Sequence, residues 1–318
     1  MFNKQKIEDI LNIVMTAVIA NIILFFFKMS GFENILIAAP FIVVLYKYGI
    51  KEYILSLIIT AIPAYFIVGL EGLILQMIMI VAISSISAYC MKKRMPIGKI
   101  VGISGLVSFG IILLSLLAYY LITNENPIQA MNNTIMASID NIEKVISNDI
   151  NFTPEMVKEY IVYFKKTVND LFRVLPAIFL IYSLVISFTN LIISIFIMKK
   201  TGVNIFYSTK INRLTLNKNF RYLLLIYIIF IVIAYIPGSG LELAAENIST
   251  VSKALLFFNG LSYIDYFLEM RFGKITRVIY WIILLVILRM YIFIMFFGFL
   301  DLFTNMRYNI RKGKVNNE

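Results

Sequence analysis

One apolar stretch of the sequence carries a regular series of polar side chains that could bind a small molecule. The series is Ser183, Ser187, Asn190 and Ser194, at intervals that place them on one face of a helix. Hydroxyl and amide groups can hydrogen bond to a polar ligand, so we predict a ligand pocket here. The predicted pocket residues are Tyr182, Ser183, Ser187 and Asn190. Hydrogen bonding between helices is the alternative, because serine and asparagine commonly serve that purpose in membranes.

Two charged residues lie within apolar stretches toward the end of the chain. Arg289 lies well inside the run 279–300, and Asp265 belongs to the preceding run. An ionisable group at that depth in a membrane usually faces protein or water and has a partner. We therefore predict an intramembrane ion pair between Arg289 and Asp265. A structural role and a transport role for the pair are both open.

The closing stretch 298–314, GFLDLFTNMRYNIRKGK, places an acid and several bases directly after the last apolar run. Its pattern has an echo, since 265–272 reads DYFLEMRF and 301–308 reads DLFTNMRY. On a helix the stretch has an apolar, a polar and a basic face, and Arg307 belongs to the basic one. This arrangement predicts an amphipathic anchor at the membrane interface.

The residues that most enzymes and metal centres need are missing. The sequence has no histidine, which removes the usual general base and the commonest metal ligand. The single cysteine, Cys90, excludes an internal disulfide and a cysteine metal cluster. A phosphate-binding glycine loop with a lysine is also missing. We expect no enzyme activity, no cofactor and no metal site, so any ATPase must reside on another chain.

The composition indicates that membrane helices carry these residues. The chain has 318 residues, of which 60% are hydrophobic and 15% charged, too few polar side chains for a soluble surface. Its formal charge of +11 comes largely from short basic loops, which orient a chain in a membrane. We predict an all-α, multi-pass protein of the cell membrane that contacts the lipid bilayer and binds no nucleic acid.

Nine runs approach the length of about 20 mostly apolar residues that a spanning helix needs. They are 10–27, 35–46, 53–68, 72–90, 100–122, 175–198, 222–236, 254–268 and 279–300. The second and the eighth are short, although a helix beginning near Leu241 would lengthen the eighth. Because two of the nine runs are short, we predict a bundle of about 8–9 transmembrane helices.

The long segment 123–172 should lie outside the cell, because acidic residues dominate it. Asn126-Pro127 and Thr153-Pro154 each combine a capping residue with a proline at the first helical position. Apolar residues at helical spacing follow both signals. We predict two amphipathic helices that lie on the membrane or cap the bundle. A structural lid without a ligand role is the alternative.

The basic loops give an orientation with one contradiction. The clusters at 92–99 and 199–221 both belong in the cytoplasm, and two spans separate them, so they agree. Nine spans would place the basic tail at 307–314 outside. Eight spans, with 254–268 as a re-entrant segment, would place the tail in the cytoplasm. They would also place the basic residues at 271–277 outside. The length available from Leu241 favours nine spans, and the side of the C-terminus stays open.

Three motifs resemble the YybS-like family of uncharacterised bacterial membrane proteins. They are AAPFIVVLYKYGIKEYILSLIITAI, FFNGLSYIDYFL and FFGFLDLFTNMR. The last is similar to the closing signature of that family, which corresponds here to Gly298, Asp301 and Arg307. The first six helices of that family in turn look like the substrate-binding components of energy-coupling-factor (ECF) vitamin transporters and like the rod-shape protein MreD.

The resemblance implies a six-helix core at 1–200 and a C-terminal extension of about three helices at 201–318. It also implies a small-molecule-binding component of a transporter, with other membrane subunits and ATPase chains as partners. ECF substrate components commonly dock through an Ala-x-x-x-Ala face, whereas here Asn21 follows Ala17 at that spacing. The alternative is a non-transporting scaffold or regulatory partner, whose loop 201–221 would hold cell-envelope or signalling proteins.

Overall fold

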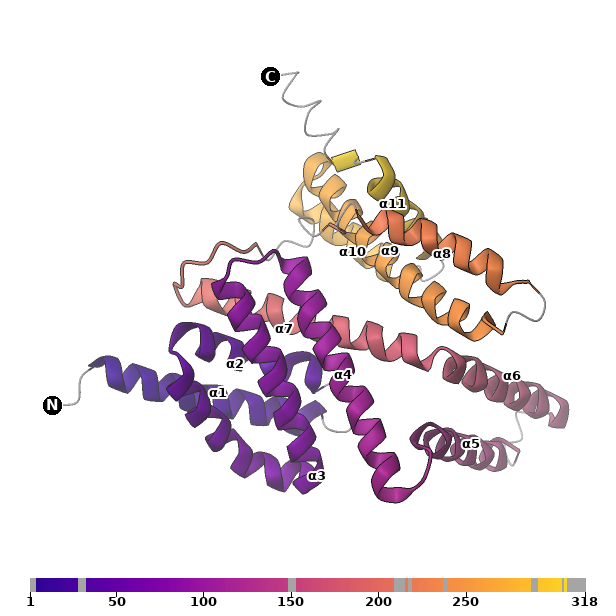
Figure 1. The fold of residues 1–318 in the computed structure, drawn as a ribbon, viewed down its shortest axis with the longest axis horizontal. Coiled ribbons are helices and arrows are strands. Elements are labelled where there is room, and N and C mark those ends of the chain that lie inside the picture. The colour runs from indigo at the N-terminus through magenta and orange to yellow at the C-terminus, as the bar shows by residue number, and fades with distance from the viewer. Residues whose placement is uncertain are drawn as a thin grey trace, which may run out of the picture. The chain divides into compact units, whose positions relative to one another are not determined.

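The computed structural model describes residues 4–27, 33–147, 153–208, 215–216, 219–236, 240–286, 291–304 and 306–307. Over these residues the chain forms 11 helices (Figure 1). They are α1 (Lys4–Phe27), α2 (Asn34–Lys47), α3 (Ile50–Lys92), α4 (Ile97–Thr123), α5 (Pro127–Ile146), α6 (Pro154–Arg173), α7 (Leu175–Lys200), α8 (Phe220–Ala234), α9 (Glu242–Arg271), α10 (Lys274–Val286) and α11 (Tyr291–Thr304). The predicted all-α class is confirmed.

Four of the described helices, α1, α3, α4 and α7, are long and apolar enough to cross a membrane. The helices α2, α8 and α11 are also apolar but shorter. Large apolar side chains such as Phe66 and Ile122 point outward, with 81% and 80% of their surface exposed. Such a surface suits lipid rather than water. The chain is a multi-pass membrane protein, while the number of 8–9 spans stays a prediction.

The helix α3 consists of two antiparallel arms rather than one long rod. Its Gly69 has φ 75° and ψ 178°, a conformation essentially restricted to glycine. The chain folds back there, so that the Tyr53 hydroxyl lies 2.7 Å from Oγ of Ser84. A straight helix would place these two residues about 46 Å apart. The predicted runs 53–68 and 72–90 correspond to these two arms (Figure 1).

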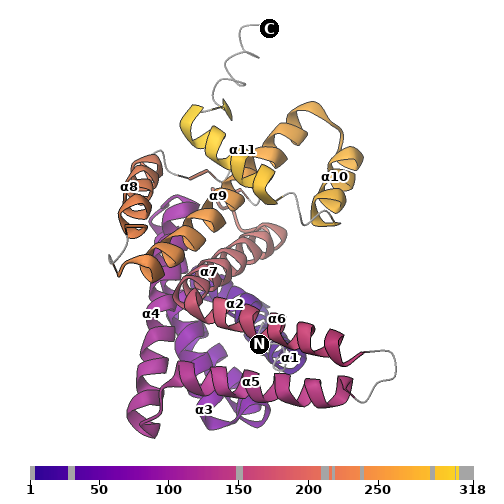
Figure 2. The same cartoon turned by 90° about the vertical axis from the view of Figure 1, so that its right-hand side faces the viewer.

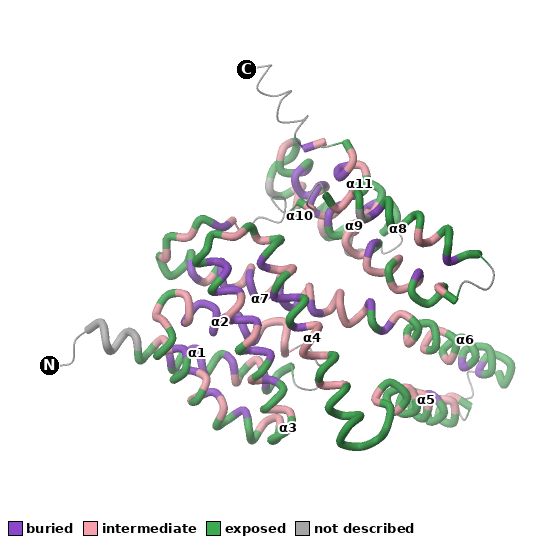
Figure 3. The backbone as a smooth tube through the Cα atoms, in the orientation of Figure 1, coloured by how far each residue is buried: buried purple, intermediate pink, exposed green. Residues whose placement is uncertain are grey.

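The short helix α2 is the most buried part of the bundle (Figure 3). Its Ile42 packs in one hydrophobic cluster with residues of α3, α4 and α7. Its Phe41 packs in a second cluster with residues of α1 and α3. Because lipid is as apolar as these side chains, close packing rather than escape from water holds α2 in place. The polar side chains on the helices around α2 are therefore held in fixed positions.

The two predicted amphipathic helices of the outer segment are present as α5 and α6, which lie side by side (Figure 2). Asn126 Oδ1 accepts hydrogen bonds from the first turn of α5, and Thr153 Oγ1 accepts one from Met156. Ile139 of α5 packs against Val157 of α6 in a small apolar cluster. Local capping and an apolar stripe therefore determine both helices.

Packing divides the chain into two compact units that do not follow the sequence order. One comprises Met1–Ile111, Leu180–Ile226 and Ser252–Glu318, and the other comprises Ile112–Phe179 and Tyr227–Val251. The boundaries fall within α4, α7, α8 and α9, so each of these helices contributes to both units. The predicted division at residue 200 into a core and an extension stays a prediction.

Candidate functional site

The polar face of α7 points into the bundle and lies against α2. Its four polar residues, at 183, 187, 190 and 194, have no exposed surface. Asn190 Nδ2 donates a hydrogen bond to the carbonyl oxygen of Asn34 at 2.8 Å. Ser194 Oγ donates to the carbonyl oxygen of Ala39 at 3.0 Å. Part of the polar face thus forms hydrogen bonds between helices, as the structural alternative expects.

Other atoms of the same region are buried without a hydrogen-bond partner. Within the described residues, four such oxygens belong to residues at the start of α2 or on the face of α7 that lies against α2, and we call them the α2–α7 oxygen cluster. They are Glu33 Oε2, Asn34 Oδ1, Ser187 Oγ and Asn190 Oδ1. A buried polar atom without a partner costs about 1–3 kcal/mol. A protein that keeps several in one place has a reason other than packing.

The connections between these residues show that they share one location. The carbonyl oxygen of Asn34 accepts a hydrogen bond from Asn190. The Asn34 side chain forms a hydrogen bond with the Tyr182 hydroxyl, and the charge of Glu33 also acts on that hydroxyl. Ser187 lies one helical turn before Asn190 on the same face of α7. Of the predicted pocket residues, Ser187 and Asn190 belong to the cluster, Tyr182 borders it and Ser183 is buried on the same face. Their role in ligand binding stays a prediction.

Sequence reasoning missed Glu33 and Asn34. These two residues directly precede the short apolar run 35–46 and lie outside it. The available signal was an acid and an amide at the start of a helix that is otherwise entirely apolar in its first turns. Their approach to Asn190 depends on packing between segments 156 residues apart, which no local pattern encodes.

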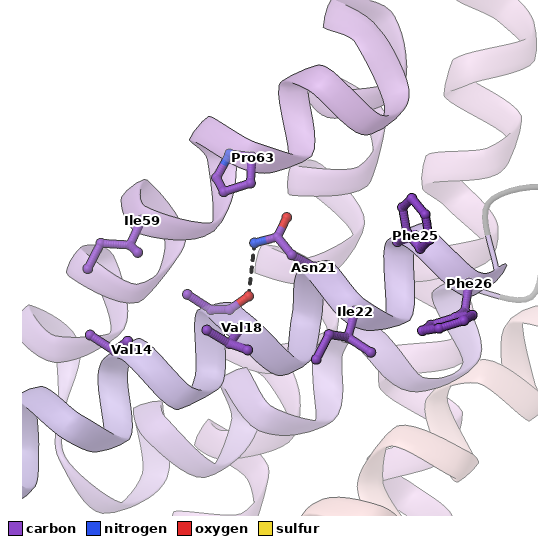
Figure 4. A pocket seen from close by; sticks show the side chains of 9 residues that line it. Val14, Val18, Asn21, Ile22, Phe25, Phe26, Ile59 and Pro63 are labelled. Atoms are coloured by element: carbon purple, nitrogen blue, oxygen red, sulfur yellow. Dashed lines mark hydrogen bonds between the residues drawn. The ribbon is translucent and has the colours of Figure 1, made fainter.

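A separate hollow of about 350 Å³ lies between α1 and the first arm of α3 (Figure 4). Asn21 points toward α3, where its Nδ2 lies 2.9 Å from the Ala17 carbonyl oxygen and 3.4 Å from that of Thr60. The walls are otherwise apolar, and Phe26 beside it is 72% exposed. The hollow is lined by Val14, Ala17, Val18, Asn21, Ile22, Phe25, Phe26, Ile59 and Pro63. It includes none of the predicted pocket residues.

Asp265 on α9 is buried and accepts hydrogen bonds from two residues of α10. Arg277 donates to it through Nε at 2.7 Å and through Nη2, and Trp281 Nε1 donates at 3.0 Å. Arg289, the partner predicted from the sequence, lies outside the described residues. The predicted pair of Arg289 and Asp265 therefore stays a prediction.

The helices α9 and α11 cross with their backbones in direct contact. A Cβ atom on Gly260 would lie 1.9 Å from the carbonyl oxygen of Ile294. A Cβ atom on Gly298 would lie 2.0 Å from the carbonyl oxygen of Leu256. Since no side chain fits in such a space, this crossing requires glycine at both positions.

Buried polar groups surround that crossing. Asn259 Nδ2 donates to the Gly298 carbonyl at 2.8 Å, and Arg307 Nε lies 3.1 Å from Asp301 Oδ2. The guanidinium of Arg307 also donates to Ser262 Oγ at 3.1 Å and to the Asn259 carbonyl at 3.2 Å. The signature residues Gly298, Asp301 and Arg307 thus form a structural joint with the motif FFNGLSYIDYFL of α9.

For Arg307, the prediction of a basic face at the membrane interface is wrong, since this residue is only 9% exposed. The physical reason is that the joint offers it a carboxylate, a hydroxyl and a carbonyl, which together replace water. Residues 308–318, which carry the rest of the predicted anchor, lie outside the described residues.

Comparison with known proteins adds a family to this description. The family model of a predicted membrane protein, DUF2232, matches residues 3–302. The chain belongs to this family. The DUF2232 match extends over α2, α7, α9 and nearly all of α11, and so includes the oxygen cluster and the α9–α11 joint except for Arg307. No curated protein matches the chain, and no solved structure does.

Proposed function

We propose that this chain is a solute-binding component of a membrane transport system and has no catalytic activity of its own. The observation that supports the proposal is the α2–α7 oxygen cluster, with its four buried oxygens that lack a partner. The energy for transport would come from other chains, since the sequence has no nucleotide-binding loop.

Membrane energetics favour a binding role for this cluster. Inside a bilayer, no solvent is at hand to satisfy polar atoms, so each one left without a partner is expensive. Alanine at position 187 would pack equally well and would leave nothing unsatisfied. The presence of a serine and two amides at one place therefore favours a ligand-binding role over a purely structural one. The likeness of the YybS-like family to ECF substrate components points in the same direction.

A thermal-shift screen of the purified protein in mild detergent tests the proposal. We expect at least one metabolite or ion to raise the melting temperature of the wild type, and Asn190→Ala to abolish that rise. Ser194→Ala is the matched control, because its hydroxyl is equally buried but has partners. If no compound in a broad screen shifts the wild-type melting temperature, the binding proposal is wrong.

A scaffold is the second candidate, and two contacts made by described residues of the basic loop favour it. The Tyr207 hydroxyl donates to the Met91 carbonyl at 3.3 Å, and the Leu216 amide donates to Asn259 Oδ1 at 3.2 Å. Loop residues held in this way would suit a docking platform for other proteins. Co-purification in mild detergent separates the candidates, since a transporter ATPase supports the first and envelope or signalling proteins support the second.

A further inference from the structure

The unsatisfied atoms of the α2–α7 oxygen cluster are almost all of one chemical kind. The oxygens of Glu33, Asn34 and Asn190 can accept hydrogen bonds when the carboxyl is ionised, but none of them can donate one. The hydroxyl of Ser187 can do both. The cluster therefore has a surplus of acceptors, and its ligand must supply donors or positive charge.

The amide of Asn190 has only one reasonable orientation. Its Nδ2 lies 2.8 Å from the carbonyl oxygen of Asn34 and 2.9 Å from that of Ile186. A flipped amide would place Oδ1 against two carbonyl oxygens, which repel it. Oδ1 of Asn190 is therefore the free atom of this amide.

Charge and space limit the ligand further. Glu33 is the one acid of the cluster, so a single positive charge balances it. Ser187 and Asn190 have no exposed surface, so a ligand that reaches both must be an ion or a very small molecule rather than a vitamin. Divalent cations usually bind through more carboxylates than this. The N-terminus of α2 contributes roughly half a positive charge, and the full charge of Glu33 outweighs it.

We infer that the α2–α7 oxygen cluster binds a small monovalent cation, either an alkali metal ion or a small protonated amine. This inference rests on the proposed function and names the class of its ligand. Both kinds of cation present positive charge to hard oxygen atoms. They differ because an ammonium group directs its hydrogens at separate acceptors, whereas a metal ion accepts lone pairs from all sides.

The test uses the purified full-length chain in detergent, in N-methylglucamine chloride at constant ionic strength. Sodium, potassium, ammonium or methylammonium chloride then replaces that salt in steps. We expect a saturable rise in melting temperature, on the order of 5 °C near saturation, with one of these cations. Saturation by sodium or potassium identifies a metal-ion site, and saturation by an ammonium ion identifies an amine site. An equal, non-saturating response to every salt overturns the inference.

Variants locate the effect. Glu33→Gln keeps the shape but removes the charge, and we expect it to weaken cation binding at least tenfold; Ser187→Ala should weaken it less. Glu71→Gln, an exposed acid on α3, and Ser194→Ala should bind like the wild type. Equal binding by Glu33→Gln and the wild type would place the cation elsewhere and overturn the inference.

The outcome also separates this inference from the proposed function. If neutral or anionic metabolites stabilise the wild type but not Asn190→Ala, while no cation does, the proposed function stands and the cation inference is wrong. If neither metabolites nor cations stabilise the wild type, both are wrong.

Discussion

At the scale of single residues, the α9–α11 crossing depends on two glycines, which carry no Cβ atom. Gly260 and Gly298 allow the backbones of the two helices to touch, and the Asn259 side chain then reaches the Gly298 carbonyl. Because Asp301 lies three residues and Arg307 nine residues beyond Gly298, the same contact brings their charges to α9. The closing residues Gly298, Asp301 and Arg307 therefore have a physical explanation as a joint.

We predict that Gly298→Ala weakens this joint. The new Cβ atom would overlap the Leu256 carbonyl oxygen, so the helices must separate, at a cost of about 1–3 kcal/mol. Thermal unfolding in detergent measures the loss. Gly102→Ala on α4 is the control, because no heavy atom lies within 4 Å of its added Cβ and alanine is the better helix former. Equal stability of the two variants would mean that α9 and α11 do not touch at Gly298.

At the scale of elements, the reversal of α3 at Gly69 decides how the bundle is assembled. The two arms meet through the hydrogen bond between Tyr53 and Ser84, and both contribute to the cluster that surrounds Phe41 of α2. A continuous helix of 43 residues would be about 65 Å long, roughly twice the thickness of the hydrocarbon core. The reversal lets α3 cover α2 from two directions.

We predict a short distance between spin labels at positions 55 and 81, one on each arm. Leu55 and Val81 are both exposed, so labels there should not disturb the packing. A straight helix would separate them by about 39 Å, whereas arms that fold back should bring them well below that distance. Double electron–electron resonance in a Cys90→Ala background, which removes the buried thiol, measures the distance. A value near that of the straight helix would exclude the hairpin.

At the scale of the whole molecule, one contact bears on the side of the C-terminus. Leu216 belongs to the basic loop that we place in the cytoplasm, and its amide binds Asn259 on α9. Asn259 in turn binds Gly298 of α11, so the end of α11 should lie on the cytoplasmic side as well. Of the last apolar run, the structure describes the part in α10 up to Val286 and the part in α11 from Tyr291.

We therefore expect the chain to cross the membrane an even number of times, with α10 and α11 making no net crossing. This arrangement places the basic clusters at 271–277 and 307–314 inside, which removes the contradiction among the basic loops. A reporter fused after Glu318 should be cytoplasmic, and one fused after Gly240 should be outside. An external reporter after Glu318 would show that α10 and α11 together complete a ninth span.

The sequence by itself determined the helices and the membrane setting. Hydrophobic runs located the membrane helices, and Asn126 and Thr153 marked the starts of α5 and α6. The helix begun near Leu241 was also predicted, and α9 starts at Glu242. These features depend on neighbours within about four residues, because capping and helical periodicity are local.

The tertiary structure alone decided which residues meet. Asn190 could have bonded to any backbone carbonyl at its depth, and packing selected Asn34. Asp265 could have met any arginine within reach, and among the described residues packing selected Arg277. The physical reason is that long-range partners depend on how helices cross, and crossing depends on the summed fit of many side chains. No single residue in the sequence records that sum.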